Sequence, residues 1–314
     1  MLDLPEAPVG KTGWPWTDAP EPLPELMPDG SPWTKISVVT PSYNQGQFIE
    51  ETIRSVLLQG YPNLEFIIID GGSTDNTLEI IRKYEPWLAY WVSEPDRGQS
   101  HAINKGIDKA TGEIVFWLNS DDLVLPGAFV RVAELFSIHP DISIITGQAQ
   151  IINENGEMVG KLKSYFTSWE ELITNPGNSI RQISTFFRRS LFDLYGLLDE
   201  GLFIAMDTDL LSRFTKYHSP LLLSDELSAF RVQPNAKTAN QLLIGYQETD
   251  KNRLSHLSGR LRSRYRFRSS SNWVNLARSG AYSKEERLLC LKKAFKLNMS
   301  VLFCPRFWQS LFWE

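Results

Sequence analysis

The chain of 314 residues has few of the side chains that build disulfide frameworks or multi-ligand metal sites. Its two cysteines, Cys290 and Cys304, both lie near the C-terminus and cannot form a disulfide framework, which fits a reducing compartment. The four histidines are scattered without metal-site spacing. Small disulfide-stapled domains and histidine-rich zinc modules are therefore excluded.

Long apolar runs are also missing. No stretch of about 18 apolar residues occurs, and residues 1–6 have neither the basic start nor the apolar core of a signal peptide. A hydrophobic content of 42 % with 22 % charged residues is that of a globular protein rather than a disordered one. We therefore expect a cytoplasmic protein.

Charge is unevenly distributed along the chain. Residues 251–314 hold 14 basic and 3 acidic side chains, a net charge of +11, whereas residues 1–250 hold 18 and 34, a net charge of −16. This asymmetry predicts that the tail and the body meet different partners. No nucleic-acid partner is expected.

The distribution of proline and of apolar residues predicts three regions. Residues 1–34 are rich in proline and predict an extended arm. Residues 35–235 predict a globular domain with halves at 35–125 and 126–235, and the second half includes a hairpin around Asn155-Gly156. The family resemblance given below implies that this is a catalytic domain, with a nucleotide-binding half followed by an acceptor half. Residues 236–314 predict a basic, aromatic helical extension.

Strand and helix patterns alternate in the nucleotide-binding half. Apolar runs rich in β-branched residues predict strands at 36–40, 64–70, 88–93 and 114–118, with helical periodicity between them. Such alternation favours right-handed βαβ units and an open α/β sheet, whose ligands bind beyond the carboxyl ends of the strands. A polar segment comes after each predicted strand: Pro41-Ser-Tyr-Asn, Asp70-Gly-Gly-Ser-Thr-Asp, Glu94-Pro-Asp-Arg-Gly and Asn119-Ser-Asp-Asp.

Two adjacent carboxylates, Asp121 and Asp122, come after the last of these strands. Their mutual repulsion would be relieved by a divalent cation with a preference for oxygen, Mg²⁺ or Mn²⁺, which could also hold a diphosphate. The alternative is that one of them forms an Asx turn or caps a helix.

Three other positions carry similar alternatives. The Asp70 segment could contact a ligand or be an ordinary turn between strand and helix, and the Tyr43 ring could stack on a base or fill its loop. Asp207 precedes an apolar helical stretch, so it could be a fixed functional carboxylate or a helix cap. Neither the dinucleotide fingerprint nor the phosphate-binding loop motif is present.

In combination these segments resemble a known family. The four polar segments, Arg97-Gly98 with Asn104-Lys105-Gly106, and Ala205-Met-Asp-Thr-Asp-Leu occur in the order typical of family 2 glycosyltransferases with the GT-A fold. The resemblance covers residues 35–235. It implies an α/β fold with a mostly parallel, Rossmann-like central sheet flanked by helices, and the C-terminal helical extension comes after it here.

The resemblance also implies roles for single residues. Thr40, Pro41, Tyr43 and Asp70 match positions that line the nucleoside pocket, with Asp70 accepting a hydrogen bond from the base. Arg97 matches the loop that flanks the donor sugar and phosphates, and Arg231 a late basic position near the diphosphate. Asn119, Ser120 and Asp121 match the Asp-x-Asp motif, which contacts the ribose and the metal, and Asp207 matches the catalytic base.

Three departures from the family pattern bear on these roles. Gly71 replaces a second aspartate that often stands after the second strand, Asn119 replaces the first aspartate of the metal motif, and Gln233 stands where many relatives carry histidine. Asp121, helped by Asp122, is therefore the expected ligand of Mn²⁺ or Mg²⁺, with the donor diphosphate completing the shell.

The implied reaction is inverting transfer of a sugar, of the hexosyltransferase type, from a nucleoside diphosphate to a hydroxyl of a glycan or lipid-linked acceptor. Bacterial surface-polysaccharide synthesis is the usual setting of similar proteins. Two alternatives stay open: a sugar-phosphate nucleotidyltransferase, and a nucleotide-sugar-binding regulator without catalysis.

The tail prompts a prediction of its own. Basic residues precede aromatic ones, a combination suited to an anionic membrane at the inner face of the plasma membrane. The alternative is that the aromatics pack internally. The residues concerned are Arg260, Arg262, Arg264, Arg266, Arg268, Phe303, Phe307, Trp308, Phe312 and Trp313.

Overall fold

The computed structural model describes residues 4–18, 21–175, 180–233, 241–279 and 282–303. The chain divides into two compact units. The first, called here the sheet unit, comprises Met1–Phe166 and Ser179–Gln241. The second, the helical unit, comprises Thr167–Asn178 and Leu242–Glu314. A short segment from the middle of the chain thus belongs with the C-terminal helices.

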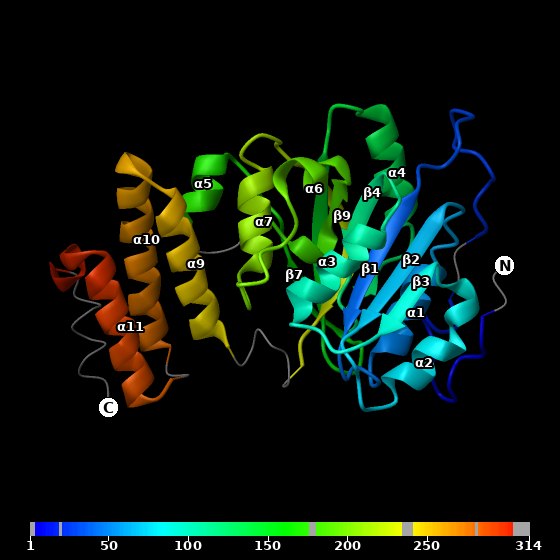
Figure 1. Ribbon diagram of the computed structural model, residues 1–314, viewed down its shortest axis with the longest axis horizontal. Helices are drawn as coiled ribbons and strands as arrows, with labels where there is room; N and C mark the ends of the chain where they lie inside the picture. Colours follow the sequence, from blue (N-terminus) through cyan, green and yellow to red (C-terminus); the bar gives the residue numbers. More distant parts are fainter. Residues whose placement is uncertain (1–3, 19–20, 176–179, 234–240, 280–281, 304–314) are drawn as a thin grey trace. The chain divides into compact units, whose positions relative to one another are not determined.

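A mixed β-sheet organises the sheet unit (Figure 1). Its order is β3-β2-β1-β4-β8-β6-β9-β5, with β7 paired to β6. The strands β1, β2, β3 and β4 are mutually parallel, and β8 joins β4 in the antiparallel sense. The strand bounds are Ile36–Ser42 (β1), Leu64–Asp70 (β2), Tyr90–Ser93 (β3), Ile114–Trp117 (β4), Leu123–Val124 (β5), Ile144–Ile152 (β6), Met158–Leu162 (β7), Thr185–Arg188 (β8) and Leu221–Arg231 (β9).

Helices cover both faces of this sheet. Alternate residues of β1 point to opposite sides: Val38 joins the core with Ile53 of α1, whereas Val39 meets Gly106 of α3. A Cβ at Gly106 would lie 2.2 Å from Val39 Cγ1, so glycine permits this close approach. The helix bounds are Ile49–Leu57 (α1), Thr77–Lys83 (α2), Gln99–Lys109 (α3), Ala128–Ile138 (α4), Trp169–Thr174 (α5), Ser190–Tyr195 (α6), Met206–Phe214 (α7), Leu242–His256 (α9), Gly259–Arg278 (α10) and Lys284–Leu297 (α11).

The predicted α/β class, with a central sheet flanked by helices and with C-terminal helices, is confirmed. The predicted hairpin is also present, as β6 and β7 with Gly156 in the left-handed region (φ 84°). The sequence pattern did not reveal that β6 begins at Ile144 and also pairs in parallel with β9. This second pairing brings the end of β9 to the loop after β4.

Glu65 fixes the sheet edge from which the parallel strands start. Its carboxylate is buried, accepts hydrogen bonds from Ser37 Oγ, Thr111 N and Thr111 Oγ1, and lies 2.9 Å from Lys35 Nζ. Burial alone would raise its pKa, but these donors outweigh burial and lower the pKa of Glu65 to about 2.

In the helical unit, α9, α10 and α11 pack around Trp273 and the buried, free thiol of Cys290, and α5 packs on Leu257 and Tyr265. The Asp250 carboxylate on α9 joins this core to α10, because it accepts hydrogen bonds from Tyr265 Oη, Ser269 Oγ and Trp273 Nε1. Among the described residues, no helix is long and apolar enough to cross a membrane. Cys304 lies outside the described residues.

Candidate active site

The loops after β1 and β2 are joined by hydrogen bonds at the carboxyl edge of the sheet. Asn44 N donates to Ser73 Oγ (2.7 Å), and Thr74 N donates to Asn44 Oδ1 (2.8 Å). Gly46 N donates to Asp75 Oδ2 (2.9 Å). Asn44 has a positive φ of 52°, a conformation that asparagine tolerates better than most residues. These contacts give the edge a defined shape before any ligand arrives.

Asp70 holds the loop after β2 in place. Its side chain is fully buried, and its Oδ2 accepts hydrogen bonds from Gly72 N (3.0 Å), Ser73 N (2.8 Å) and Ser93 Oγ (2.6 Å). Its Oδ1 accepts from Ser73 Oγ. Both oxygens are therefore used inside the protein. Oδ1 has this single donor among the described residues, so the hydrogen bond from the base to Asp70 stays a prediction.

The residues after β1 differ in how open they are to a ligand. Thr40 is fully buried, and its hydroxyl has no hydrogen-bond partner in the described part of the chain. Pro41 is buried as well. The side chain of Tyr43, by contrast, is 60 % exposed. The roles of Thr40 and Pro41 in the nucleoside pocket stay predictions, and Tyr43 is the most exposed of the three residues.

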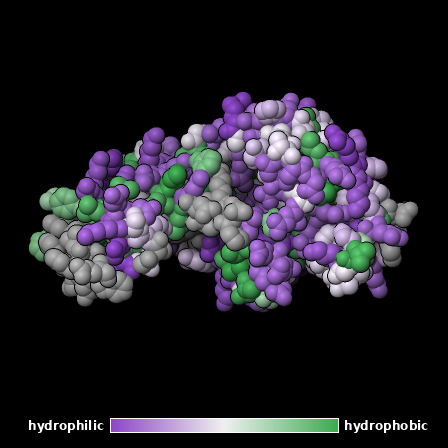
Figure 2. Space-filling view, turned by 90° about the horizontal axis from the view of Figure 1, so that it is seen from below, coloured by the Kyte–Doolittle hydropathy of each residue, from purple (hydrophilic) through white to green (hydrophobic). Residues whose placement is uncertain are grey.

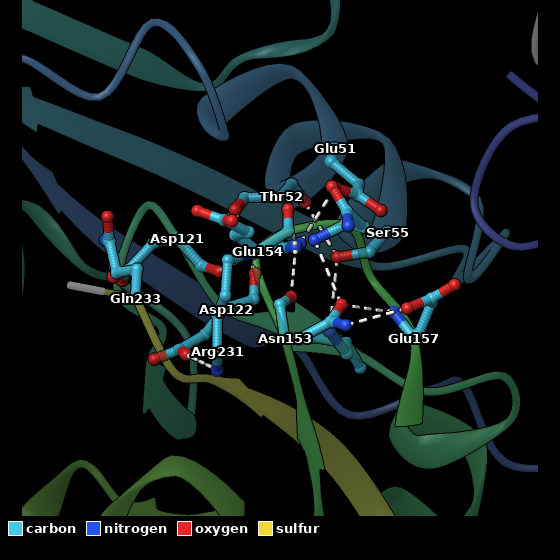
Figure 3. Close-up of polar contacts among 12 residues, drawn as sticks. Glu51, Thr52, Ser55, Asp121, Asp122, Asn153, Glu154, Glu157, Arg231 and Gln233 are labelled. Atoms are coloured by element: carbon cyan, nitrogen blue, oxygen red, sulfur yellow. Dashed lines mark hydrogen bonds and ion pairs between the residues drawn. The ribbon is translucent and has the colours of Figure 1, made fainter. Parts of the chain in front are cut away.

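Asp122 belongs to the interior of the site (Figure 3). It is 1 % exposed, and its Oδ1 accepts from Arg231 N (2.9 Å) while its Oδ2 accepts from Asn119 Nδ2 (3.1 Å). Burial and, after it, the negative charge of Asp121 raise the pKa of Asp122 well above its ordinary value. Each oxygen thus has one donor within the protein, and the metal contact of Asp122 stays a prediction.

Asp121 is the more accessible of the two carboxylates. It is half-buried, and its Oδ2 accepts a hydrogen bond from Gln233 Nε2 (2.7 Å), just beyond the end of β9. Burial raises the pKa of the Asp121 carboxyl. Gln233 therefore orients this carboxylate from the position at which many relatives carry histidine.

Arg231 lies at the centre of the network in Figure 3. Its side chain is 1 % exposed, and Nε donates to the carbonyl of Asp121 (2.8 Å). Nη1 donates to the carbonyls of Asn153 and Glu154 (3.1 Å each), and Nη2 pairs with Glu51 Oε2 (2.8 Å). With its guanidinium committed to these partners, Arg231 fastens the hairpin and α1 to the Asp121 loop. The contact of Arg231 with the diphosphate stays a prediction.

The residues around Asp121 fit one divalent cation held by a single carboxylate. Asp121 Oδ1 has no hydrogen-bond partner among the described residues, and a cation there would offset the burial of the charge. The described residues contain no cluster of three or more histidine, cysteine, aspartate or glutamate side chains that could hold a metal by themselves. A cation at Asp121 would therefore need further ligands from the donor.

The loop before α3 and the loop before α7 enclose a cavity of about 220 Å³, lined by residues that include Arg97, Gly98 and Glu200. Arg97 is exposed and its guanidinium pairs with Glu200 (2.6 Å). Asn104 on α3 fastens the second loop, since it exchanges hydrogen bonds with Leu198 N (3.0 Å) and Leu198 O (2.9 Å). The predicted donor loop is thus bound to the segment that leads to Asp207.

Asn119 and Ser120 stand at the turn after β4. Gln99 Nε2 at the start of α3 donates to Asn119 Oδ1 (2.8 Å), while the Asn119 amide donates to Asp122. Asn119 thus links two loops of the edge. Ser120 is 4 % exposed, so its side chain offers little surface to a ligand.

Asp207 lies in the first turn of α7. The N-cap of this helix is Ala205, which makes no side-chain capping bond, so the functional and the capping interpretations of Asp207 both stay predictions. Its Oδ1 accepts from the adjacent Thr208 N (2.6 Å), and the side chain is half-exposed. Asp209, in the same helical turn, is buried and pairs with Arg213 (2.9 Å). Of these two carboxylates, Asp207 is the accessible one.

A mixed sheet with polar loops at the carboxyl edge of its parallel strands, and a carboxylate after β4, is an α/β arrangement whose ligands bind at that edge. The sequence model described as glycosyl transferase family 2 matches residues 37–196. The chain therefore belongs to family 2 of the glycosyltransferases, a family of sugar-transferring enzymes.

Individual relatives agree with this membership. The chain is 30 % identical to poly-beta-1,6-N-acetyl-D-glucosamine synthase of Staphylococcus epidermidis over 53 % of its own length and 42 % of the synthase. It spans less than half the length of the first curated relatives it matches.

Two solved structures resemble the fold. Staphylococcus aureus TarS residues 1–349, in complex with UDP-GlcNAc, superposes with a TM-score of 0.64 at 19 % identity, covering 84 % of this chain and 80 % of that one. A Pyrobaculum calidifontis mannosyltransferase with GDP-Man and Mn²⁺ gives 0.53 at 19 % identity, covering 91 % and 86 %. These likenesses show the GT-A fold.

Proposed function

We propose that this chain transfers a sugar from a nucleoside diphosphate to an acceptor hydroxyl with inversion at the anomeric carbon. The observation that carries the proposal is the half-buried Asp121 carboxylate, oriented by Gln233 at the carboxyl edge of the parallel strands. A nucleotide-sugar donor also agrees with the UDP-GlcNAc and GDP-Man bound to the two structural neighbours.

In the proposed reaction the acceptor oxygen forms a bond to the anomeric carbon as the bond from that carbon to the diphosphate oxygen breaks. Asp207 takes the proton of the attacking hydroxyl, and the electron pair leaves with the nucleoside diphosphate. A single displacement of this kind inverts the anomeric centre. The accessible position of Asp207 in the first turn of α7 supports its assignment as the base.

A divalent cation, Mn²⁺ or Mg²⁺, completes the proposal at Asp121. When bound, it would neutralise charge that develops on the leaving diphosphate. The chain's own part is to present one oxygen of Asp121, with the other held by Gln233 (2.7 Å). The Mn²⁺ in the mannosyltransferase complex supports this choice of ion.

The proposed setting is bacterial surface-polysaccharide synthesis with a glycan or lipid-linked acceptor. This setting is supported by the name of one relative, the poly-beta-1,6-N-acetyl-D-glucosamine synthase of Staphylococcus epidermidis.

Peripheral association with an anionic membrane through the helical unit is a second part of this proposal. Figure 2 shows apolar residues interspersed with hydrophilic ones on these helices. Phe267 is 58 % exposed and Phe303 90 % exposed, and Arg260 and Arg262, on the same helix as Phe267, are also accessible.

The other tail residues of the membrane prediction either have internal partners or lie outside the described residues. Arg264 and Arg268 pair with Glu171, and Arg266 Nε donates to the Leu297 carbonyl (2.6 Å), so these three have internal partners. Phe307, Trp308, Phe312 and Trp313 lie outside the described residues.

A panel of nucleotide sugars tests the proposal. The purified protein with Mn²⁺ should bind one donor and hydrolyse it slowly, releasing nucleoside diphosphate, with Asp121→Ala inactive and Asp141→Ala, on an exposed loop before β6, unaffected. Donor binding without hydrolysis or transfer would instead identify the regulator. Release of pyrophosphate from a nucleoside triphosphate and a sugar phosphate would identify the nucleotidyltransferase.

A further inference from the structure

The described start of the N-terminal arm packs on α1 (Figure 1). Arg54 of α1 is 5 % exposed, and its guanidinium donates to the carbonyls of Pro15 (3.0 Å) and Trp16 (3.0 Å). The guanidinium also donates to the carbonyl of Pro5 (2.7 Å) and lies 5.4 Å from the centre of the Trp16 ring. A buried guanidinium with three carbonyl acceptors fixes the chain that carries them. Residues 5–16 are therefore attached to the sheet unit through α1.

Trp14 stands in a closed turn of this arm. Trp16 N and Thr17 N both donate to the carbonyl of Gly13 (2.6 Å and 2.8 Å), and Gly13 N donates to Thr17 Oγ1 (2.8 Å). Gly13 has a φ of 75°, a conformation that glycine adopts without steric cost. Because the turn is closed by these bonds and anchored by Arg54, the half-buried side chain of Trp14 is held in one place.

The indole of Trp14 reaches β5, the last strand in the sheet order, whose neighbour is β9. Val124 of β5 is fully buried, its carbonyl accepts from Trp14 Nε1 (2.9 Å), and its N–H donates to Ser55 Oγ of α1 (3.1 Å). Thr52 Oγ1, on the same helix, donates to the carbonyl of Asp122 (2.8 Å), and both side chains of α1 appear in the close-up of the site (Figure 3). The arm and α1 therefore hold the backbone of residues 122–124 together.

The carboxylate proposed to hold the cation lies directly before this segment. Asp121 precedes residues 122–124, and Gln233 Nε2 orients one of its oxygens (2.7 Å). The path of the backbone sets the direction in which the Asp121 side chain points, so the bond from Trp14 to Val124 acts on it from three residues away. Such control matters at a reacting centre, because a displacement of about 1 Å can cost about 100-fold in rate.

We propose that Trp14 is a positioning residue for sugar transfer, because its indole N–H fixes β5 and thereby the orientation of the Asp121 carboxylate. This inference rests on the proposed function, since it concerns the carboxylate that the proposed function assigns to the cation and the donor diphosphate. Trp14 acts on the site through the backbone of β5 and not by contact with a ligand. The N-terminal arm is in this way part of the framework of the active site.

Trp14→Phe tests this role in the full-length protein, since it keeps an aromatic ring but removes the donor to the carbonyl of Val124. Transfer from the donor that the panel identifies should fall by about 10-fold, in line with a displacement of less than about 1 Å. The Mn²⁺ concentration for half-maximal transfer should rise by a similar factor, because Asp121 is the proposed protein ligand. Both are measured well below the thermal midpoint of each variant, so that loss of folded protein does not contribute.

Trp33→Phe is the matched control in the same arm. Trp33 Nε1 also donates to a backbone carbonyl at 2.9 Å, but this carbonyl belongs to Pro24 of the arm itself. Trp33 is buried, so its substitution should lower the thermal midpoint. It should leave the transfer rate and the Mn²⁺ dependence at the wild-type level. If Trp33→Phe changed both as much as Trp14→Phe does, general loosening of the arm would be the cause, and the role of Trp14 would be overturned.

Hydrogen–deuterium exchange adds a measurement that needs no donor. Amides of residues 119–125 should exchange faster in Trp14→Phe than in the wild type, and at the wild-type rate in Trp33→Phe. Unchanged exchange of this segment in Trp14→Phe, or faster exchange with unchanged transfer and Mn²⁺ dependence, would overturn the role of Trp14 alone. A wild-type protein that transfers no sugar from any donor would overturn the proposed function and the positioning role with it, and exchange would then still show whether Trp14 holds the segment.

Discussion

Substitution of Arg231 separates a structural role from contact with the donor. Its guanidinium is 1 % exposed and pairs at 2.8 Å with Glu51, whose side chain is 12 % exposed. Removing one partner of a buried ion pair typically costs about 3–5 kcal/mol, because the other charge stays buried without compensation. Arg231→Met should lower the free energy of unfolding by this amount, a large share of the about 5–15 kcal/mol available to a typical domain.

Two further variants show which interactions of Arg231 account for the loss of unfolding free energy. Arg231→Lys retains the charge but cannot reach the carbonyls of Asp121 and the hairpin together, so it should still cost about 2 kcal/mol. Arg231→Met/Glu51→Gln removes the stranded carboxylate and should recover part of the loss. Arg131→Met is the control: its pair with Asp225 is exposed, at 3.5 Å, and is worth at most about 1 kcal/mol.

The assay is urea unfolding monitored by tryptophan fluorescence, combined with nucleotide titration of the folded protein. Arg231→Lys should unfold at lower urea than the wild type. The reasoning would be refuted if Arg231→Lys and Arg231→Met kept the stability of the wild type and lost only nucleotide affinity, since Arg231 would then face the diphosphate.

Three other outcomes are expected. Excess EDTA should abolish sugar transfer, and full activity in EDTA would contradict the requirement for a divalent cation. Asp121→Ala should also abolish transfer while it keeps a native circular dichroism spectrum. Glu65 has a pKa lowered to about 2 in the folded state, so the stability it adds is present above its unfolded pKa of about 4.5 and is lost as the pH falls toward 2. Glu65→Gln should therefore reduce, by about 3 kcal/mol, the free energy of unfolding that is lost as the pH falls from about 4.5 to 2. An unchanged loss would contradict the lowered pKa of Glu65. Full-length protein should float with anionic liposomes more than residues 1–250 do, and equal flotation would remove the membrane proposal.

The parallel half of the fold was predictable because its signals are local. A nearly continuous apolar run such as 64–70 identifies a strand buried on both faces, and a polar segment directly after it identifies the ligand edge. The accessible positions of Tyr43, Asp121 and Asp207 agree with the roles expected of them, which stay predictions.

The surroundings of Asp70 and Arg231 depend on contacts between distant parts of the chain, which no local pattern predicts. Asp70 accepts a hydrogen bond from Ser93, at the end of the next strand. Arg231 is buried because β9 pairs with β6 and the guanidinium reaches Glu51, which lies 180 residues earlier.

The general base is tested most directly by Asp207→Asn, assayed for both transfer rate and nucleotide affinity with the donor that the panel identifies. The variant keeps the size of the side chain and its bond to Thr208 while removing the basic oxygen. Transfer should fall by about two to four orders of magnitude, the usual worth of general base catalysis, and nucleotide affinity should barely change. A transfer rate within a few-fold of the wild type would contradict the assignment of Asp207 as the group that activates the acceptor.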